Sequence, residues 1–270
     1  MTKIKVNDIN IYYELHGDGF PLIFIMGQSG TVSHFKNSIL FNDFEKYLFK
    51  KFKTLLFDNR GIGQTDDVDK QYTIKTLADD VAGLIDALNL RKVNILGFSM
   101  GGMIAQELII NYPEKIEKCV IGSTHCGRPK CIMPSRETFS GPPPFQEGVT
   151  PEELIKYQIP LVYTEDYINS NPKIIDYIIQ NRISHPVPLK VYQKQINAVL
   201  RFKSYKNLPT VQVPILILHG KDDLLVPPQN AEILADLIPE AKLKIFENSG
   251  HGLLTEQTEA VMNTILNFFV

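Results

Sequence analysis

The chain has 270 residues, of which 44% are hydrophobic and 21% are charged. This composition is typical of a folded globular protein and excludes disordered and collagen-like chains. Its 28 basic residues are balanced by 30 acidic ones, giving a net charge of -2, so the chain lacks the broad positive field with which proteins hold nucleic acid. Its cysteines are odd in number and form no Cys-x-x-Cys pair, so neither a disulfide framework nor a metal site is expected. They are Cys119, Cys126 and Cys131.

The first residues contain no apolar segment of signal-peptide length, and no stretch of the chain is long enough to cross a bilayer. We therefore expect a cytoplasmic protein without a membrane partner. Two short runs of alternating residues, 3–6 and 9–15, are parted by Asn7 and Asp8. They predict an antiparallel hairpin at one edge of a sheet.

Four nearly continuous apolar runs follow, as expected of strands that are covered on both faces. They lie at residues 22–26, 54–58, 93–96 and 118–122. Segments of helical period separate them, most clearly residues 74–90 behind an N-cap at Thr73. This alternation is typical of strand-helix-strand units, so we predict an α/β fold whose mostly parallel sheet carries helices on both faces.

The alternation stops near Gly127 and resumes at residues 214–218. The intervening segment begins with the proline-rich stretch 141–144 and then has helical patterns, at residues 152–163, 173–183 and 189–205. We predict a helical cap over residues 128–209, inserted into a core formed by residues 1–127 and 210–270. A helix at 229–237, a strand at 242–246 and a helix from about residue 256 would complete the core.

Ser99 lies between Gly97 and Gly101, after the predicted strand 93–96 and before the helical run 103–110. A strand that turns abruptly into a helix strains the serine backbone, and side chains at the two flanking positions would collide with neighbouring elements. The turn lifts the serine hydroxyl into a cleft at a helix N-terminus, where negative charge is stabilised. Ser99 is therefore the predicted nucleophile, the alternative being a structural glycine turn.

A serine hydroxyl needs a base, and the base needs a carboxylate to orient it. In strand-serine-helix enzymes the chain order is serine, acid, histidine. Here Asp222 and Asp223 follow one late strand and His251 follows the next, so either aspartate can be the acid and His251 the base. The other histidines are expected at the hairpin exit, in the cap, at a strand end or lining the cleft. They are His16, His185, His219, His34 and His125.

These motifs resemble the α/β-hydrolase superfamily over nearly the whole chain outside the cap. The family pattern Gly-x-Ser-x-Gly fits residues 97–101, and its Gly-x-x-Asp-x-x-x-Pro turn fits residues 220–227. The resemblance therefore implies Asp223, and not its neighbour Asp222, as the acid. It also implies His251 as the base.

The resemblance further implies an oxyanion hole formed by the backbone N–H groups of Gln28 and Met100. The chain departs from the family pattern at Met26, where the family commonly has histidine. Residues 58–65 resemble a structural turn of the family and are not expected to bind phosphate. The thiols of Cys126 and Cys131 are expected to be buried or to line the pocket, and not to serve as a second nucleophile.

Together these residues predict a hydrolase that cleaves a carboxylic ester or lactone through an acyl-enzyme, with neither cofactor nor metal. Residues 97–102 resemble those of 3-oxoadipate enol-lactonases, which makes a lactone plausible, and the expected partner is a small apolar substrate. Carbon-carbon bond hydrolases and cofactor-free haloperoxidase-like enzymes are the alternatives within the fold. A non-enzymatic member that binds a small ligand or a partner protein is the alternative outside catalysis. The pattern carries no information on oligomeric state.

Overall fold

The structure, a computed structural model, describes residues 2–135, 138 and 150–270. Its strands form one sheet, and their bounds are β1 (Lys3–Val6), β2 (Ile9–His16), β3 (Phe20–Ile25), β4 (Phe52–Phe57), β5 (Val93–Phe98), β6 (Ile116–Gly122), β7 (Ile215–Gly220) and β8 (Lys242–Phe246). The α-helices of the core are α1 (Val32–Lys36), α2 (Ile39–Tyr47), α3 (Ile74–Ala87), α4 (Met100–Asn111), α9 (Gln229–Leu237), α10 (Leu253–Glu256) and α11 (Thr258–Phe269). Those inserted between β6 and β7 are α5 (Pro151–Val162), α6 (Glu165–Ser170), α7 (Pro172–Ser184) and α8 (Leu189–Arg201).

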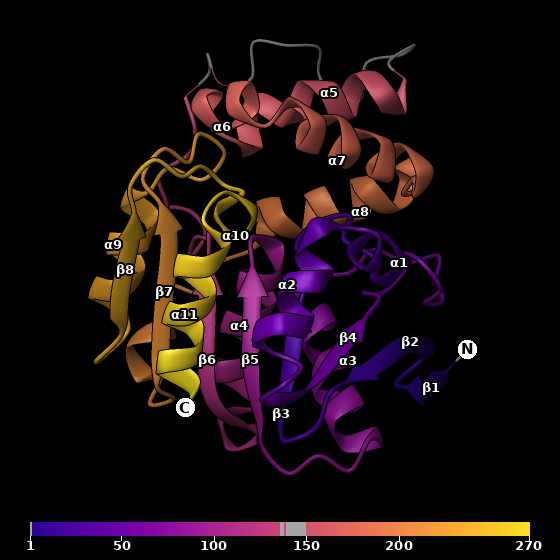
Figure 1. Cartoon of the computed structure of the whole chain (residues 1–270). Coiled ribbons are helices and arrows are strands. Elements are labelled where there is room, and N and C mark those ends of the chain that lie inside the picture. The colour runs from indigo at the N-terminus through magenta and orange to yellow at the C-terminus, as the bar shows by residue number, and fades with distance from the viewer. Residues whose placement is uncertain (1, 136–137, 139–149) are drawn as a thin grey trace.

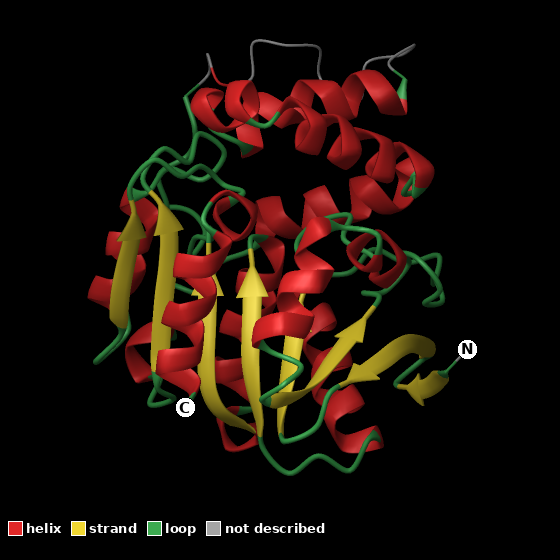
Figure 2. Ribbon diagram, viewed as in Figure 1, coloured by secondary structure: helices red, strands yellow, loops and turns green. Residues whose placement is uncertain are grey.

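The sheet has the strand order β1-β2-β4-β3-β5-β6-β7-β8. β1 pairs antiparallel with β2, and β2 pairs antiparallel with β4. All remaining neighbours are parallel, so their carboxyl ends meet at one edge of the sheet (Figure 2). The predicted mostly parallel sheet with an antiparallel N-terminal hairpin is confirmed.

Two apolar clusters cover the two faces of the sheet. Along β3, Leu22 and Phe24 join one cluster while Ile23 and Ile25 join the other, because successive side chains of a strand point to opposite faces. Helices α3, α4 and α9 pack on one face, and α2, α10 and α11 pack on the other (Figure 1). The prediction of helices on both faces is therefore confirmed.

Several helix bounds differ from those predicted, for local reasons. The helix predicted over residues 74–90 ends at Ala87, because Asn89 adopts a left-handed φ of 53°. The helix predicted over residues 189–205 ends at Arg201, because Phe202 is extended. The sequence patterns give no bounds for helices α1, α2 and α6.

Helices α5 to α8 lie over the carboxyl ends of the parallel strands, at the top of the view in Figure 1. The predicted helical insertion before the last two strands is thus present. The proline-rich stretch 141–144 lies outside the described residues. The division into a core of residues 1–127 and 210–270 and a cap of residues 128–209 stays a prediction.

Two neighbouring side chains fasten α8 to the core. The Nζ of Lys194, which is buried, donates to Asp67 Oδ1 at 2.8 Å and to the carbonyl of Val68 at 2.8 Å. The Oε1 of Gln195 accepts from the backbone N–H of Ser29 at 3.0 Å. Helix α8 therefore holds the loop after β3 in place from above.

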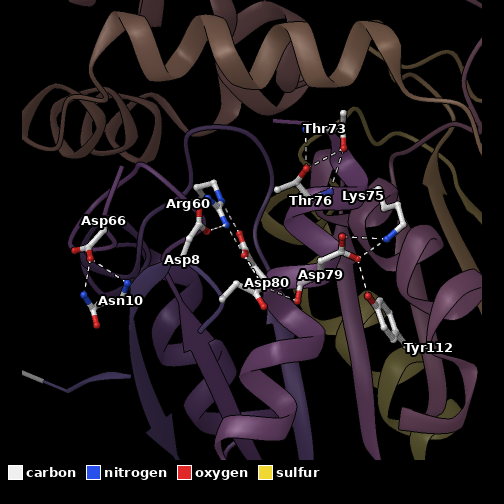
Figure 3. Close-up of polar contacts among 11 residues, drawn as sticks. Asp8, Asn10, Arg60, Asp66, Thr73, Lys75, Thr76, Asp79, Asp80 and Tyr112 are labelled. Atoms are coloured by element: carbon white, nitrogen blue, oxygen red, sulfur yellow. Dashed lines mark hydrogen bonds and ion pairs between the residues drawn. The ribbon is translucent and has the colours of Figure 1, made fainter. Parts of the chain in front are cut away.

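The turn at residues 58–65 is built by buried polar contacts. Arg60 donates from Nε to Asp80 Oδ2 at 2.8 Å and from a terminal nitrogen to Asp80 Oδ1 at 2.7 Å (Figure 3). Asp58 accepts from the backbone N–H groups of Val32 and Gln64 at 2.6 and 2.7 Å. These contacts agree with the structural role expected of this turn.

The buried pair of Arg60 and Asp80 gives a stability prediction, because both side chains are almost fully covered, at 6% and 4% exposed. We expect Asp80→Asn to lower the free energy of unfolding by about 3 kcal/mol, since the guanidinium then loses its buried counter-charge and keeps only the exposed carboxylate of Asp8. Urea denaturation measures this loss. The control is Asp8→Asn, whose carboxylate also binds Arg60 but is 54% exposed, and which is expected to cost less than about 1 kcal/mol. Equal losses in the two variants would contradict this assignment.

Candidate active site

Ser99 forms the turn between β5 and α4. Its φ of 56° and ψ of -121° place a non-glycine residue in a strained backbone region, at a cost of about 1–3 kcal/mol. Neighbouring groups hold it there. Its N–H donates to the carbonyl of Gly122 at 2.9 Å, and its own carbonyl accepts from the Thr124 hydroxyl at 2.9 Å. The strain is therefore fixed by the surrounding structure, as it is at functional sites.

The two flanking glycines are required by close packing. A Cβ on Gly97 would lie 2.4 Å from the carbonyl oxygen of Gly101. A Cβ on Gly101 would lie 2.0 Å from the carbonyl oxygen of Ile25 in β3. Both distances are far below van der Waals contact, so any side chain at these positions would push α4 away from the sheet.

Asp223 follows β7 and His251 follows β8, and their side chains meet. His251 Nδ1 lies 2.8 Å from Asp223 Oδ2. The other carboxylate oxygen, Oδ1, accepts from the backbone N–H groups of Leu225 and Val226 at 2.9 and 2.8 Å. Asp222 is exposed and has no such contact. The structure thus pairs His251 with Asp223, the residue that the family spacing implies.

The charge of Asp223 is stabilised by its surroundings. Burial by itself raises the pKa of this carboxyl, but the imidazoles of His251 and His219 and the hydrogen bonds they donate outweigh burial and lower the pKa well below its usual range. Asp223 therefore stays ionised at any pH at which the protein is expected to work, and can balance a positive charge on His251.

Ser99 and His251 line the same cavity. Within the described ranges no hydrogen bond joins the Ser99 hydroxyl to the His251 ring, and such contacts are often loose in the absence of substrate. The hydroxyl of Ser123 donates to the His251 carbonyl at 3.1 Å, which holds the main chain of this histidine. The structure therefore brings the three predicted catalytic residues to one place.

The loop after β3 reaches Ser99 through a glycine. A Cβ on Gly27 would lie 3.3 Å from Ser99 Cβ, so the backbone that leads to Gln28 lies against the serine. In the part of the chain that the structure describes, the backbone N–H of Gln28 has no hydrogen-bond partner. Met100 begins α4, where the first N–H groups of a helix have no partner within the helix. The assignment of Gln28 and Met100 as oxyanion donors stays a prediction.

The cavity has a volume of about 240 Å³ and is mostly apolar. No Lys, Arg, Asp or Glu occurs among the described residues that line it. Met26, at the position where the family pattern has histidine, is one of the lining residues, and so is Tyr163 of the cap. The main apolar lining consists of Phe24, Phe35, Ile39, Phe98, Ile178 and Leu254.

The remaining histidines take different places. His34 lines the cavity, whereas His125 is buried outside its described lining and accepts from the Gly127 N–H at 3.1 Å. His219 is fully buried, with Nε2 lying 2.8 Å from the Val226 carbonyl and 3.2 Å from Asp223 Oδ2. The sequence indicated only a strand-end role for His219, but the structure places it against Asp223.

The three cysteines are buried free thiols. Burial raises the pKa of Cys126 to about 11, so its reactive thiolate form is scarce at neutral pH. Neither Cys126 nor Cys131 belongs to the described lining of the cavity. This arrangement supports the expectation that neither thiol is a second nucleophile.

Glu256 is a site residue that sequence reasoning missed. Its Oε2 accepts from the Gly250 N–H at 2.6 Å, next to His251, and its Oε1 accepts from the Thr164 N–H at 2.7 Å in the cap. The Gly252 N–H also donates to the cap carbonyl of Val162 at 2.7 Å. The loop that carries His251 is thus fastened to the cap, and no sequence motif marks this contact.

Among the described residues, no three His, Cys, Asp or Glu side chains lie close enough together to hold a metal ion. None of the described helices has the length and apolar character needed to cross a membrane.

Known proteins resemble the chain over nearly its full length. A protein of Caulobacter sp. (strain K31), provisionally assigned as the carbamate hydrolase RutD, is 26% identical over 96% of this chain and 95% of its own. A protein of Mycobacterium tuberculosis (strain H37Rv), provisionally assigned as the non-heme bromoperoxidase BpoC, is 27% identical over 97% of this chain and 98% of its own. The solved enol-lactonase of Burkholderia xenovorans LB400 superposes with a TM-score of 0.82 at 22% identity and covers 99% of each chain.

The profile of a protein family described as serine aminopeptidase, S33, matches residues 28–258. This range begins at the predicted oxyanion loop and includes Ser99, Asp223 and His251. The chain therefore belongs to this family of hydrolases, within the α/β-hydrolase superfamily.

Proposed function

We propose that the protein hydrolyses a small carboxylic ester or lactone through an acyl-enzyme on Ser99. The observation that carries this proposal is the 2.8 Å contact between His251 Nδ1 and Asp223 Oδ2 at the cavity that Ser99 lines. This contact leaves the other ring nitrogen of His251, Nε2, available to the serine. A strained serine, an oriented imidazole and an ionised carboxylate are the parts that acyl transfer requires.

The reaction would proceed in two halves. Ser99 Oγ attacks the substrate carbonyl carbon while His251 Nε2 takes the proton of the Ser99 hydroxyl. The backbone N–H groups of Gln28 and Met100 stabilise the oxyanion that forms. The intermediate collapses, the ester C–O bond breaks, and His251 returns the proton to the leaving oxygen. Water, activated by His251, then releases the acid and restores the Ser99 hydroxyl.

The cavity limits the size and polarity of the substrate. Its volume of about 240 Å³ lies below the range of roughly 300–1,000 Å³ that is common for ligand pockets. Its lining is mostly apolar and, within the described residues, carries neither lysine, arginine nor a free carboxylate. These properties support a small, uncharged ester or lactone.

The provisional names of the relatives concern different reactions, a carbamate hydrolase and a non-heme bromoperoxidase, at nearly equal identity. The names therefore do not choose a reaction for this chain. The choice rests on the serine hydroxyl and its base, which together suit attack on a carbonyl carbon.

The first prediction concerns the base. We expect His251→Ala to lower kcat for p-nitrophenyl acetate by about three to four orders of magnitude, because the Ser99 proton then has no acceptor. The melting temperature is expected to stay within about 4 °C of the wild type, since the side chain lines a cavity. Release of p-nitrophenol and a thermal melt measure the two quantities. Substantial turnover by a folded variant would assign the base to another histidine.

The second prediction separates the two neighbouring aspartates. We expect Asp223→Asn to lower kcat by about three to four orders of magnitude, because the neutral amide cannot balance a charged His251. The matched control is Asp222→Asn, which removes an exposed carboxylate and is expected to keep wild-type activity. The same p-nitrophenyl acetate assay measures both variants. Loss of activity in Asp222→Asn, with activity kept in Asp223→Asn, would reverse the assignment.

The third prediction follows from the lowered pKa of Asp223. A carboxyl whose pKa is lower in the folded than in the unfolded protein adds stability above its unfolded pKa, and loses this contribution as the pH falls through its folded pKa. We expect the contribution of Asp223, measured against Asp223→Asn by urea unfolding, to decrease as the pH falls below about 4. A contribution that grows on acidification would contradict the direction of the shift.

A further inference from the structure

Asn181, in α7 of the cap, lines the catalytic cavity and has a side-chain oxygen without a hydrogen-bond partner among the described residues. The residue is 8% exposed and belongs to the lining of the cavity. Its Nδ2 donates to the main-chain carbonyl of His34 at 2.9 Å. Its Oδ1 is buried, and among the described residues it has no hydrogen-bond partner.

The orientation of the Asn181 amide is fixed by its partner. The His34 carbonyl can only accept a hydrogen bond, so the amide nitrogen must face it and the oxygen must face the other way. A buried acceptor without a donor costs about 1–3 kcal/mol, and such groups are rare in folded proteins. An acceptor held in this way at the wall of a cavity therefore calls for a donor on a bound molecule.

Three other hydroxyls of the cavity lining already donate hydrogen bonds within the protein. Ser38 donates to the carbonyl of Phe35 at 2.7 Å, and Tyr177 donates to the carbonyl of Asn37 at 2.7 Å. Ser123 donates to the main chain of His251. The polar groups left for a substrate, apart from the catalytic ones, therefore include Asn181 Oδ1 and the ring of His34.

The His34 ring lies on the same wall of the cavity. Burial, followed by the charges of Arg182 and His185, lowers its pKa to about 4, so the ring is neutral at neutral pH and offers one donor and one acceptor. In the described part of the chain this ring makes no hydrogen bond. The ring stacks at 6.4 Å, between centroids, on that of His185.

The residues around Asn181 Oδ1 favour an uncharged donor group on the bound molecule. A cationic donor would be repelled by Arg182 and would find no carboxylate in the described lining. An anionic group would face the lone pairs of Asn181 Oδ1. A neutral hydroxyl or amide N–H meets neither penalty and satisfies the buried acceptor.

We propose that Asn181 Oδ1 and the His34 ring form a polar subsite of the catalytic cavity that binds an uncharged hydroxyl or amide N–H group of the substrate. This group is separate from the carbonyl that Ser99 attacks. The inference rests on the proposed ester or lactone hydrolysis and narrows its substrate class to esters or lactones that carry a second, neutral hydrogen-bond donor.

A purely structural role of Asn181 would use Nδ2 alone. That bond joins α7 to the segment after β3, and its loss would slow every substrate by a similar factor. A subsite formed by Oδ1 instead discriminates between substrates that have a donor and those that lack one. The test must therefore measure the ratio of the hydrolysis rates of a substrate that has a donor and one that lacks it.

The experiment compares methyl esters of ω-hydroxy acids with the corresponding ω-methoxy esters over a series of chain lengths. The two differ in the ability to donate a hydrogen bond, and acid release in a pH-stat gives kcat/KM for each. We expect the wild type to prefer the hydroxy ester at the chain length that reaches the subsite, by about fivefold to tenfold. The same series with ω-acetamido esters distinguishes an amide donor from a hydroxyl.

The variant Asn181→Leu keeps the size of the side chain and removes both Oδ1 and Nδ2. We expect it to abolish the preference, while the loss of the Nδ2 bond slows hydroxy and methoxy esters by the same factor. Should this variant fail to fold, Asn181→Ala removes Oδ1 without supplying another acceptor and carries the same expectation. The matched control is Asn171→Leu, which removes a similar amide-to-carbonyl bond of the cap, to Tyr167, outside the described cavity lining. It is expected to keep the preference.

The outcomes separate the two proposals. Hydrolysis of methyl esters with no hydroxy preference at any chain length, or a preference that survives in folded Asn181→Leu, would overturn the subsite alone. No hydrolysis of any ester, including p-nitrophenyl acetate, would overturn the proposed function and the subsite with it.

Discussion

The close approach of helix α4 to strands β3 and β5 is the constraint on which the site depends. It is possible only because Gly97 and Gly101 lack side chains, since a Cβ on Gly101 would lie 2.0 Å from a carbonyl oxygen of β3. This approach forces Ser99 into its strained conformation and places it at the start of a helix. The parallel order of the sheet then brings the loops after β7 and β8 to the same edge, where Asp223 and His251 meet.

The cap is joined at several points to the core and to the loop that carries His251. Lys194 and Gln195 of α8 hold the segments around Asp67 and Ser29. Glu256 connects Thr164 of the cap to the loop that carries His251. Hydrogen bonds close to the site therefore fix the position of the cap residues that line the cavity relative to Ser99. This arrangement explains how a cap residue such as Asn181 can discriminate between substrates.

The sequence predicted the parts of the molecule that obey local rules. Strands buried on both faces are continuous apolar runs, so the strands of the sheet could be predicted. The serine turn needs glycines at a fixed spacing, so the turn at Ser99 could be predicted as well. The choice between Asp222 and Asp223 was not settled by the residues alone, because it depends on which carboxylate turns inward to the N–H groups of Leu225 and Val226.

Other features depend on packing between distant segments and leave no periodic signal. The bond between Asn181 and His34 joins residues 147 positions apart, and Glu256 accepts from Thr164, which is 92 positions away. Helices α1, α2 and α6 are short, and stretches of that length carry weak periodicity. The cap residues that line the cavity could be identified only once the helices were placed over the sheet.

The central claim is that Ser99 carries the acyl group during turnover. The most direct measurement is mass spectrometry of the proteolysed enzyme after acid quenching of its reaction with p-nitrophenyl acetate. An acetyl group on the peptide that contains Ser99, absent from the same peptide of Ser99→Ala, is the result that this account predicts. Steady hydrolysis by the wild type with the acetyl group on another residue, or undiminished hydrolysis by Ser99→Ala, would contradict it.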